Sequence, residues 1–162
     1  MRIGKRFATK CANIITKDNM SIPWISELKY LGVVFLASQK LKCSFSAAKR
    51  KFCIAANAIY AKISMHANED VVLHLLQTKC LPILLYCVES CPVSKSDAQS
   101  LDFIVVRFIM KLFRTSHKPT IDCCLENFGF QLPGELIQTR QSNFVRKTGR
   151  RDYALCHLYT WR

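Results

Sequence analysis

The sequence lacks a long apolar run. Its longest, Cys80–Val88, has nine residues and contains Pro82, whereas a helix needs about 20 apolar residues to cross a bilayer. The basic start of the chain, Met1–Arg6, leads into no apolar segment of the kind that secretory signals contain. We therefore expect an intracellular protein, nuclear or cytoplasmic, that has no membrane among its partners.

The sequence also lacks the compact motifs of common enzyme and metal sites. No Ser-His-Asp arrangement, Gly-rich phosphate loop or general acid/base pair stands out. The nine cysteines are odd in number and irregularly spaced, which favours reduced thiols over a disulfide framework. The late pairs Cys123-Cys124 and Cys156-His157 lack the two-residue spacing of zinc sites. We therefore expect no metal site and no cofactor.

The chain is rich in positive charge. Lysine and arginine number 24 against 11 acidic residues, which gives a formal charge of +13. Such a surplus favours a polyanionic partner through Coulomb attraction and counterion release, and nucleic acid is preferred over an anionic membrane surface. With 162 residues, half of them apolar, the chain can bury the core of one domain of ordinary size.

Before residue 40 the pattern is that of β-strands. Cys11–Thr16 and Tyr30–Phe35 are β-prone runs, and Lys17-Asp18-Asn19 is a turn signal, so we predict a two-stranded element. Two strands bury too little apolar surface to be stable alone. We expect this hairpin to belong to a larger sheet and to expose four apolar side chains: Ile14, Leu31, Val33 and Phe35.

After residue 44 the periodicity is helical. A first helix carries an apolar face made of Phe45, Ala48, Phe52, Ala56, Ile59 and Ile63. A second begins at the N-cap Asn68, with a kink or break expected near Pro82. In a third, Ser96 and Gln99 have capping-box spacing, and the apolar stripe is Leu101, Ile104, Val105, Phe108, Ile109 and Leu112. Its opposite face would carry a basic ridge of Arg107, Lys111 and Arg114.

The signals weaken from His117 onwards. Cys123–Phe128 reads as a short helix, Leu132-Pro133-Gly134 as a turn and Glu135–Arg146 as another helix. The expected fold is therefore mainly α with a small N-terminal β-hairpin, an α+β arrangement. Its parts are the hairpin in 1–40, a bundle of about three helices in 41–116, and a helical or partly disordered extension in 117–162.

Three stretches resemble one family in the same order along the chain. SELKYLGVVF (26–35), followed by SFSAAKRKFCIAANAIYAKI (44–63), is similar to the junction where the palm of a LINE-type (non-LTR) retrotransposon reverse transcriptase passes into its thumb. CLPILLYCVESCP (80–92) and SLDFIVVRFIMKLFRTS (100–116) are similar to the blocks that follow. The resemblance covers roughly residues 1–146 and implies a thumb-like bundle that holds RNA and DNA as template and primer.

The resemblance implies roles for a few residues. Tyr30-Leu31-Gly32 resembles the primer grip, a β-turn that approaches the primer backbone; the alternative is an ordinary strand with one glycine. Lys10 resembles a lysine near the departing pyrophosphate. The sequence holds no Tyr-x-Asp-Asp, however, and without paired aspartates there is no two-metal site for that lysine to serve. We expect no catalysis by this chain alone, and Mg²⁺ only in the intact parent polymerase.

Basic residues are the candidates for phosphate contacts, which position a duplex without reading its bases. A first cluster, interleaved with Phe45 and Phe52, consists of Lys40, Lys42, Lys49, Arg50 and Lys51. The resemblance favours it over the second, Arg107, Lys111 and Arg114; a solvated face is the alternative for both. The expected function is a fragment of the polymerase that binds nucleic acid and the missing fingers and palm. The alternative is a host-retained helical module that binds nucleic acid or a protein.

Overall fold

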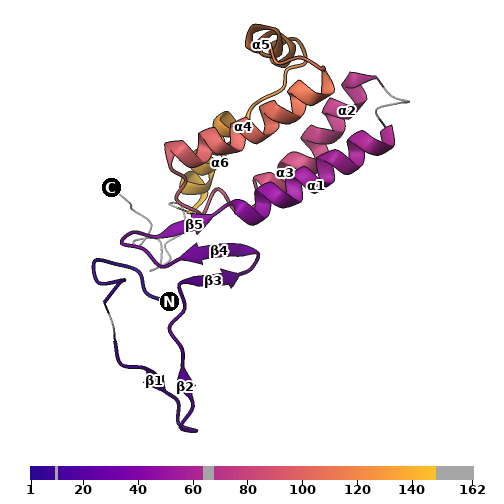
Figure 1. The fold of residues 1–162 in the computed structure, drawn as a ribbon. Coiled ribbons are helices and arrows are strands. Elements are labelled where there is room, and N and C mark those ends of the chain that lie inside the picture. The colour runs from indigo at the N-terminus through magenta and orange to yellow at the C-terminus, as the bar shows by residue number, and fades with distance from the viewer. Residues whose placement is uncertain (10, 64–67, 149–162) are drawn as a thin grey trace. The chain divides into compact units, whose positions relative to one another are not determined.

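The computed structural model describes residues 1–9, 11–63 and 68–148, and the chain divides into two compact units, Met1–Ala47 and Ala48–Arg162. The protein is mainly helical with a small antiparallel β part (Figure 1), which confirms the expected fold class. Within the described ranges, none of the helices has the length and apolar character needed to cross a membrane. Each unit is described by itself below.

The first unit opens with a two-stranded antiparallel sheet. Strand β1 (Ile14–Ile15) pairs with β2 (Ser21–Ile22), and between them Asn19 has a φ of 59°. The turn predicted at Lys17-Asp18-Asn19 is confirmed, but the strand that follows it is β2 and not Tyr30–Phe35. A loop of a few residues costs little closure entropy, so the nearest apolar segment takes the pairing.

A three-stranded antiparallel sheet follows, with strand order β3-β4-β5. Its strands are β3 (Glu27–Tyr30), β4 (Val33–Leu36) and β5 (Lys42–Ser44). Tyr30 pairs with Val33, so Leu31 and Gly32 form a two-residue loop, and their φ values of 46° and 84° are those of a type I′ turn. The prediction of one strand over Tyr30–Phe35 is therefore wrong, because the chain reverses in its middle.

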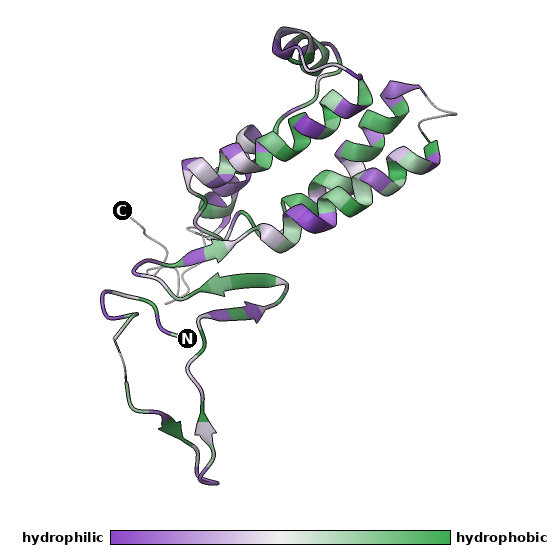
Figure 2. Cartoon of the chain, viewed as in Figure 1, coloured by the Kyte–Doolittle hydropathy of each residue, from purple (hydrophilic) through white to green (hydrophobic). Residues whose placement is uncertain are grey.

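The first unit has little core. None of its described residues before Cys43 is buried, although the green colour of β1 and β4 in Figure 2 marks them as hydrophobic. Ile14 and Leu31 are exposed as expected. Val33 and Phe35 are instead half-buried, because β4 is the central strand and has a neighbour on each side.

In the second unit, two long helical segments lie side by side. Helix α1 (Ser46–Ile63) runs beside the segment formed by α2 (Glu69–Leu75), η1 (Leu76–Cys80) and α3 (Leu81–Leu84) (Figure 1). Asn68 is the N-cap of α2, as predicted, although its side chain makes no capping hydrogen bond. The helical path continues past Pro82 through a π turn, in which the Leu81 N–H bonds to the Leu76 carbonyl. Because Pro82 has no N–H to donate, the helix widens into a π turn at this point instead of breaking.

Helix α4 (Lys95–Leu112) begins two residues earlier than the predicted capping box. Ser94 is the N-cap: its Oγ accepts from the Asp97 N–H at 3.1 Å, and Asp97 Oδ2 accepts from the Ser94 N–H at 3.2 Å. The prediction of Ser96 with Gln99 is wrong because Ser94 and Asp97 have the same spacing and stand nearer the preceding loop. The predicted stripe is buried, apart from Ile104, which is half-buried.

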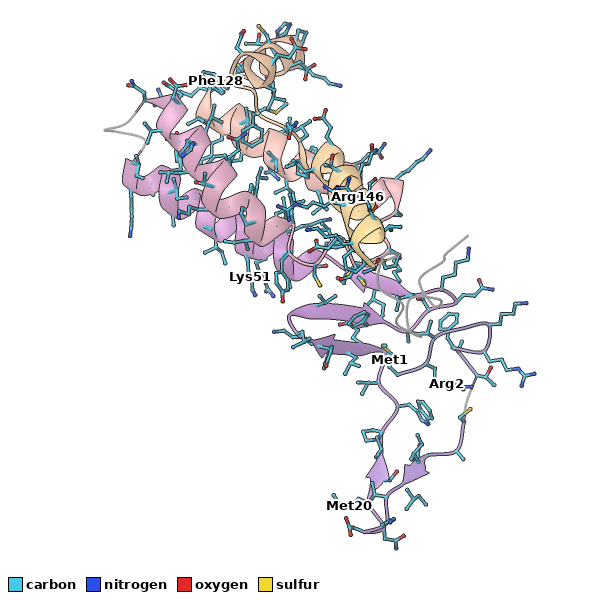
Figure 3. All side chains as sticks on the ribbon, turned by 180° about the vertical axis from the view of Figure 1, so that it is seen from behind. Met1, Arg2, Met20, Lys51, Phe128 and Arg146 are labelled. Atoms are coloured by element: carbon cyan, nitrogen blue, oxygen red, sulfur yellow. The ribbon has the colours of Figure 1, made fainter. Side chains whose placement is uncertain are left out.

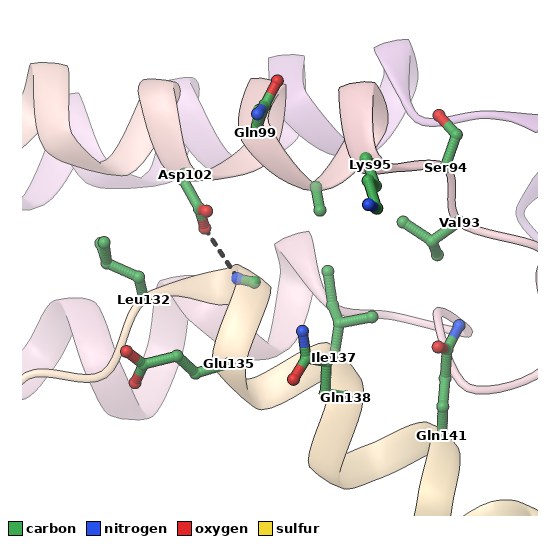
Figure 4. A pocket seen from close by; sticks show the side chains of 12 residues that line it. Val93, Ser94, Lys95, Gln99, Asp102, Leu132, Glu135, Ile137, Gln138 and Gln141 are labelled. Atoms are coloured by element: carbon green, nitrogen blue, oxygen red, sulfur yellow. Dashed lines mark hydrogen bonds between the residues drawn. The ribbon is translucent and has the colours of Figure 1, made fainter.

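Helices α5 (Lys118–Asn127) and α6 (Pro133–Thr148) both start before their predicted positions. Leu132-Pro133-Gly134 is not a separate turn, because Pro133 is already the first residue of α6. At that position a residue without an N–H loses no helical hydrogen bond. The Gly134 N–H donates to Asp102 Oδ1 of α4 at 2.7 Å (Figure 4). This bond satisfies one of the open donors at the start of α6 and joins it to α4.

The core of the second unit joins all of these helices. Phe52, Leu76 and Phe108 are buried, whereas Ile59 and Ile104, also expected in the core, are half-buried. The remaining buried side chains include Ala56, Val72, Leu84, Leu101, Val105, Ile109, Ile121 and Ile137. The predictions for Lys10 and for Cys156-His157 fall outside the described residues.

Candidate nucleic-acid interface

The tip of the β3–β4 hairpin is strongly exposed. Its Leu31 is 72% exposed, and the tight turn with Gly32 in the left-handed region brings backbone to the surface. A chain of sugar and phosphate can approach such a tip closely. Of the residues predicted to contact phosphate, Lys40 and Lys42 lie in this unit and are exposed, and the Lys40 carbonyl accepts a hydrogen bond from Ser38 Oγ.

The second unit has a groove of about 490 Å³ between α1 and α4. Apolar side chains make up its floor and basic side chains its α4 wall. Its lining residues are Phe52, Cys53 and Asn57 from α1 and Ile104, Arg107, Phe108 and Lys111 from α4. The ring of Phe108 meets that of Tyr60 edge-on, with centroids 6.2 Å apart.

Lys111 is held by α1 at this groove. Its Nζ donates to Asn57 Oδ1 at 2.9 Å and lies 4.6 Å from the centre of the Tyr60 ring, a cation–π distance. Arg114 lies beyond the end of α4 with a φ of 52°. The predicted ridge of Arg107, Lys111 and Arg114 on the back of α4 is therefore wrong: Arg107 and Lys111 line the groove, and Arg114 has left the helix.

The basic residues of α1 divide between two faces. Lys49 is half-buried, and its Nζ donates to Ser100 Oγ of α4. Arg50 precedes Cys53 by three residues and Asn57 by seven, which places it on the groove side of α1. Lys51 is turned by about 100° from Arg50 and projects from the helix (Figure 3). Arg107 and Lys111 thus line the groove, and Lys49 and Arg50 lie about one helical turn before its lining residues on α1.

Two of these cations have no internal partner. Within the described part of the chain, Arg50 and Arg107 make no hydrogen bond or ion pair, and both are exposed. No acidic side chain lines the groove. Because unpaired cations beside a low-dielectric floor attract anions strongly, the groove is electrostatically suited to phosphate groups. Asn57 was not predicted to belong to this site. Its position seven residues after Arg50, on the same face of α1, could have indicated it.

A second groove, of about 450 Å³, lies between α4 and α6 (Figure 4). It holds Asp102, Glu135 and Lys95, but Asp102 is already bonded to the start of α6. Among the residues that the structure describes, no group of three or more His, Cys, Asp or Glu side chains is placed to hold a metal ion. This second groove therefore has no evident chemistry beyond joining the two helices.

The cysteines in the described part of the chain are reduced, and Cys43, Cys80 and Cys91 are buried. Burial raises the pKa of the Cys80 thiol, because a thiolate is poorly solvated there. Cys53 in the α1–α4 groove is exposed. The prediction that the cysteines are reduced agrees with the structure. The prediction that they are buried is correct for only some of them.

Comparison with known proteins adds no family to this description. No family model matches the chain, and no curated protein and no solved structure matches it.

Proposed function

We propose that this chain is the primer-grip and thumb part of a LINE-type reverse transcriptase and binds the duplex of template and primer, RNA and DNA, in the nucleus or cytoplasm. The observation that carries the proposal is the exposed Leu31-Gly32 turn, which stands where the resemblance puts the primer grip. The ordered blocks quoted from the sequence support the same assignment. The fingers and palm of the polymerase would be its natural protein partner.

The groove between α1 and α4 supports nucleic-acid binding independently of the hairpin. Arg107 lines the groove from α4, and Arg50 lies one helical turn before Cys53 on α1. Neither cation has an internal partner among the described residues, and cations of this kind contact phosphates without sequence preference. Lys49 and Lys111 are bonded across the two helices. These two hydrogen bonds link α1 to α4, and the two ammonium groups add positive charge beside the groove.

Polymerisation by this chain alone is not part of the proposal. The sequence contains no Tyr-x-Asp-Asp, and metal-assisted phosphoryl transfer needs carboxylates to hold the ions. Purified chain should therefore extend no primer on RNA or DNA templates with Mg²⁺ or Mn²⁺. Incorporation above that of a heat-killed control would contradict this.

The primer-grip assignment is tested by a photo-cross-linking amino acid at Leu31, with the same amino acid at Met20 as control. Met20 is 68% exposed and lies at the tip of the β1–β2 hairpin (Figure 3), so the two probes have similar access to solvent. On a duplex with labelled strands, the probe at Leu31 should label the primer strand near its 3′ end, and the probe at Met20 should not. Equal labelling by both probes, or labelling of the template alone, would refute the assignment.

Binding through the groove is tested by salt dependence. Each phosphate contact contributes about one unit to the slope of log K against log salt, so replacing Arg50 and Arg107 together with Ala should weaken duplex binding and flatten the slope by about two units. Lys51→Ala with Lys62→Ala removes the same charge from another face of α1 and is the matched control. Equal loss in both double variants would mean that net charge alone drives binding.

The alternative is a helical module that binds nucleic acid or a protein for the host. The groove favours it, since the groove is built entirely within the second unit. Strong salt-dependent binding without any cross-link from Leu31 to the primer end would support this alternative over the polymerase assignment.

A further inference from the structure

Strand β3 has a free edge. In the sheet order β3-β4-β5 it has a neighbour on one side only. Leu28 pairs with Phe35 and Tyr30 with Val33, and the Ala37 N–H donates to the Ser26 carbonyl at 2.7 Å. Residues 26, 28 and 30 thus direct their backbone groups toward β4. Because the direction alternates along an antiparallel strand, the N–H and C=O of Glu27 and Lys29 point to the free edge.

These outward groups are open. Within the described part of the chain, the backbone N–H and C=O of Glu27 and Lys29 make no hydrogen bond, and all four residues of β3 are exposed. An exposed edge of this kind is a template for another strand. The remaining question is which strand fits it.

We propose that the edge is completed by β3 of a second copy of this chain, antiparallel and related by a two-fold axis, with Glu27 opposite Lys29 of the other copy. The pairing rests on the sheet alone and does not depend on the proposed nucleic-acid function. It would join two three-stranded sheets into one continuous sheet across the dimer.

Charge selects the register. A hydrogen-bonded pair needs both residues to direct their groups to the shared edge, which leaves three symmetric choices at Glu27 and Lys29. Pairing Glu27 with Glu27 of the second copy, or Lys29 with its Lys29, sets like charges opposite each other, which is destabilising. Glu27 on Lys29 gives an opposite-charge pair on each side of the axis, and each pair exchanges two backbone hydrogen bonds.

The same register brings apolar side chains together. Leu28 meets Leu28 of the second copy on the two-fold axis, at a non-hydrogen-bonded position where facing side chains are closest. Tyr30 stands diagonally across from the second copy's Leu28, within reach of a long side chain. Since no described residue before Cys43 is buried, this contact would give the first unit apolar burial that it lacks. The interface is self-complementary and closed by its two-fold axis.

Charge reversal tests the register by sedimentation equilibrium of the full chain over a range of concentrations. The parent should dimerise reversibly. Glu27→Lys and Lys29→Glu should each raise the dimer dissociation constant roughly tenfold or more, because each sets like charges opposite twice. The double variant restores opposite pairs and should return to within about threefold of the parent.

The control for charge is Glu126→Lys, an exposed position on α5, which should leave the dissociation constant unchanged. A parent that stays monomeric at every concentration would overturn the proposal. So would single variants that dimerise as well as the parent, or a double variant no better than the singles.

A second test reads the register directly by disulfide trapping under mild oxidation. Leu28→Cys should give a dimer whose mapped peptides carry a disulfide between the two copies at position 28. Ile25→Cys is the control, since Leu28 and Ile25 are 41% and 42% exposed, but the two copies of position 25 lie far apart in this register. Trapping at position 25 and not at 28 would refute the register. Cross-linking of Leu31 to primer is a separate readout, so either proposal can fail alone.

Discussion

Replacing Phe108 with Ala should destabilise the second unit by about 3 kcal/mol, at the lower end of the range for buried phenylalanines. Phe108 is 7% exposed and meets Tyr60 edge-on, a contact that adds to its burial. The loss stays at the lower end because Phe108 borders the α1–α4 groove, so the space left behind opens to water and does not remain an empty cavity.

Phe103→Ala is the matched control for this substitution. It makes the same change on the same helix, but Phe103 is 63% exposed, so its effect should lie within about 0.5 kcal/mol. The gain in helix propensity is the same for both, and the difference between them isolates burial. Urea unfolding followed by circular dichroism gives both values. Equal stability of the two variants would refute the packing of α4 against α1.

Two further predictions concern the start of α4 and a buried thiol. Ser94→Ala should cost about 1 kcal/mol through loss of the capping box, while Ser96→Ala, inside the first turn, should cost much less; the reverse order in thermal melts would favour the cap predicted from sequence. Burial raises the pKa of Cys80, so the unfolded state releases this proton first as pH rises and stability should fall on the alkaline side; Cys80→Ala should flatten that fall, which urea titrations at several pH values measure. In the native protein, iodoacetamide should modify the exposed Cys11, Cys53 and Cys123 before the buried Cys80, and equal rates would contradict the burial.

The helices were predictable because their signals are local. The apolar spacing from Phe45 to Ile63 places α1 to within one residue of its start, and Asn68 with its acidic neighbours marks the start of α2. Helix ends were less predictable. Ser94 and Ser96 both carry a suitable partner three residues on, and only the path of the preceding loop decides which of them caps α4.

The β part shows the limit of local signals. A β-prone run such as Tyr30–Phe35 does not reveal whether it is one strand or a turn between two, since a type I′ turn depends on φ values that Leu31 and Gly32 adopt only when β4 folds back on β3. Likewise, Phe35 is half-buried beside a third strand, Lys42–Ser44, in which it pairs with Cys43, and that strand has little strand character of its own.

By itself the sequence determined the mainly helical fold, the apolar faces of α1 and α4 and the excess of positive charge, because periodicity and composition act over a few turns of one element. Only the tertiary structure decided which cations share a site. Arg107 and Lys111 were expected on the back of α4, yet the packing of α4 beside α1 places them in the lining of the α1–α4 groove. A position on a helix fixes the direction of a side chain, whereas its neighbours depend on which helix packs there.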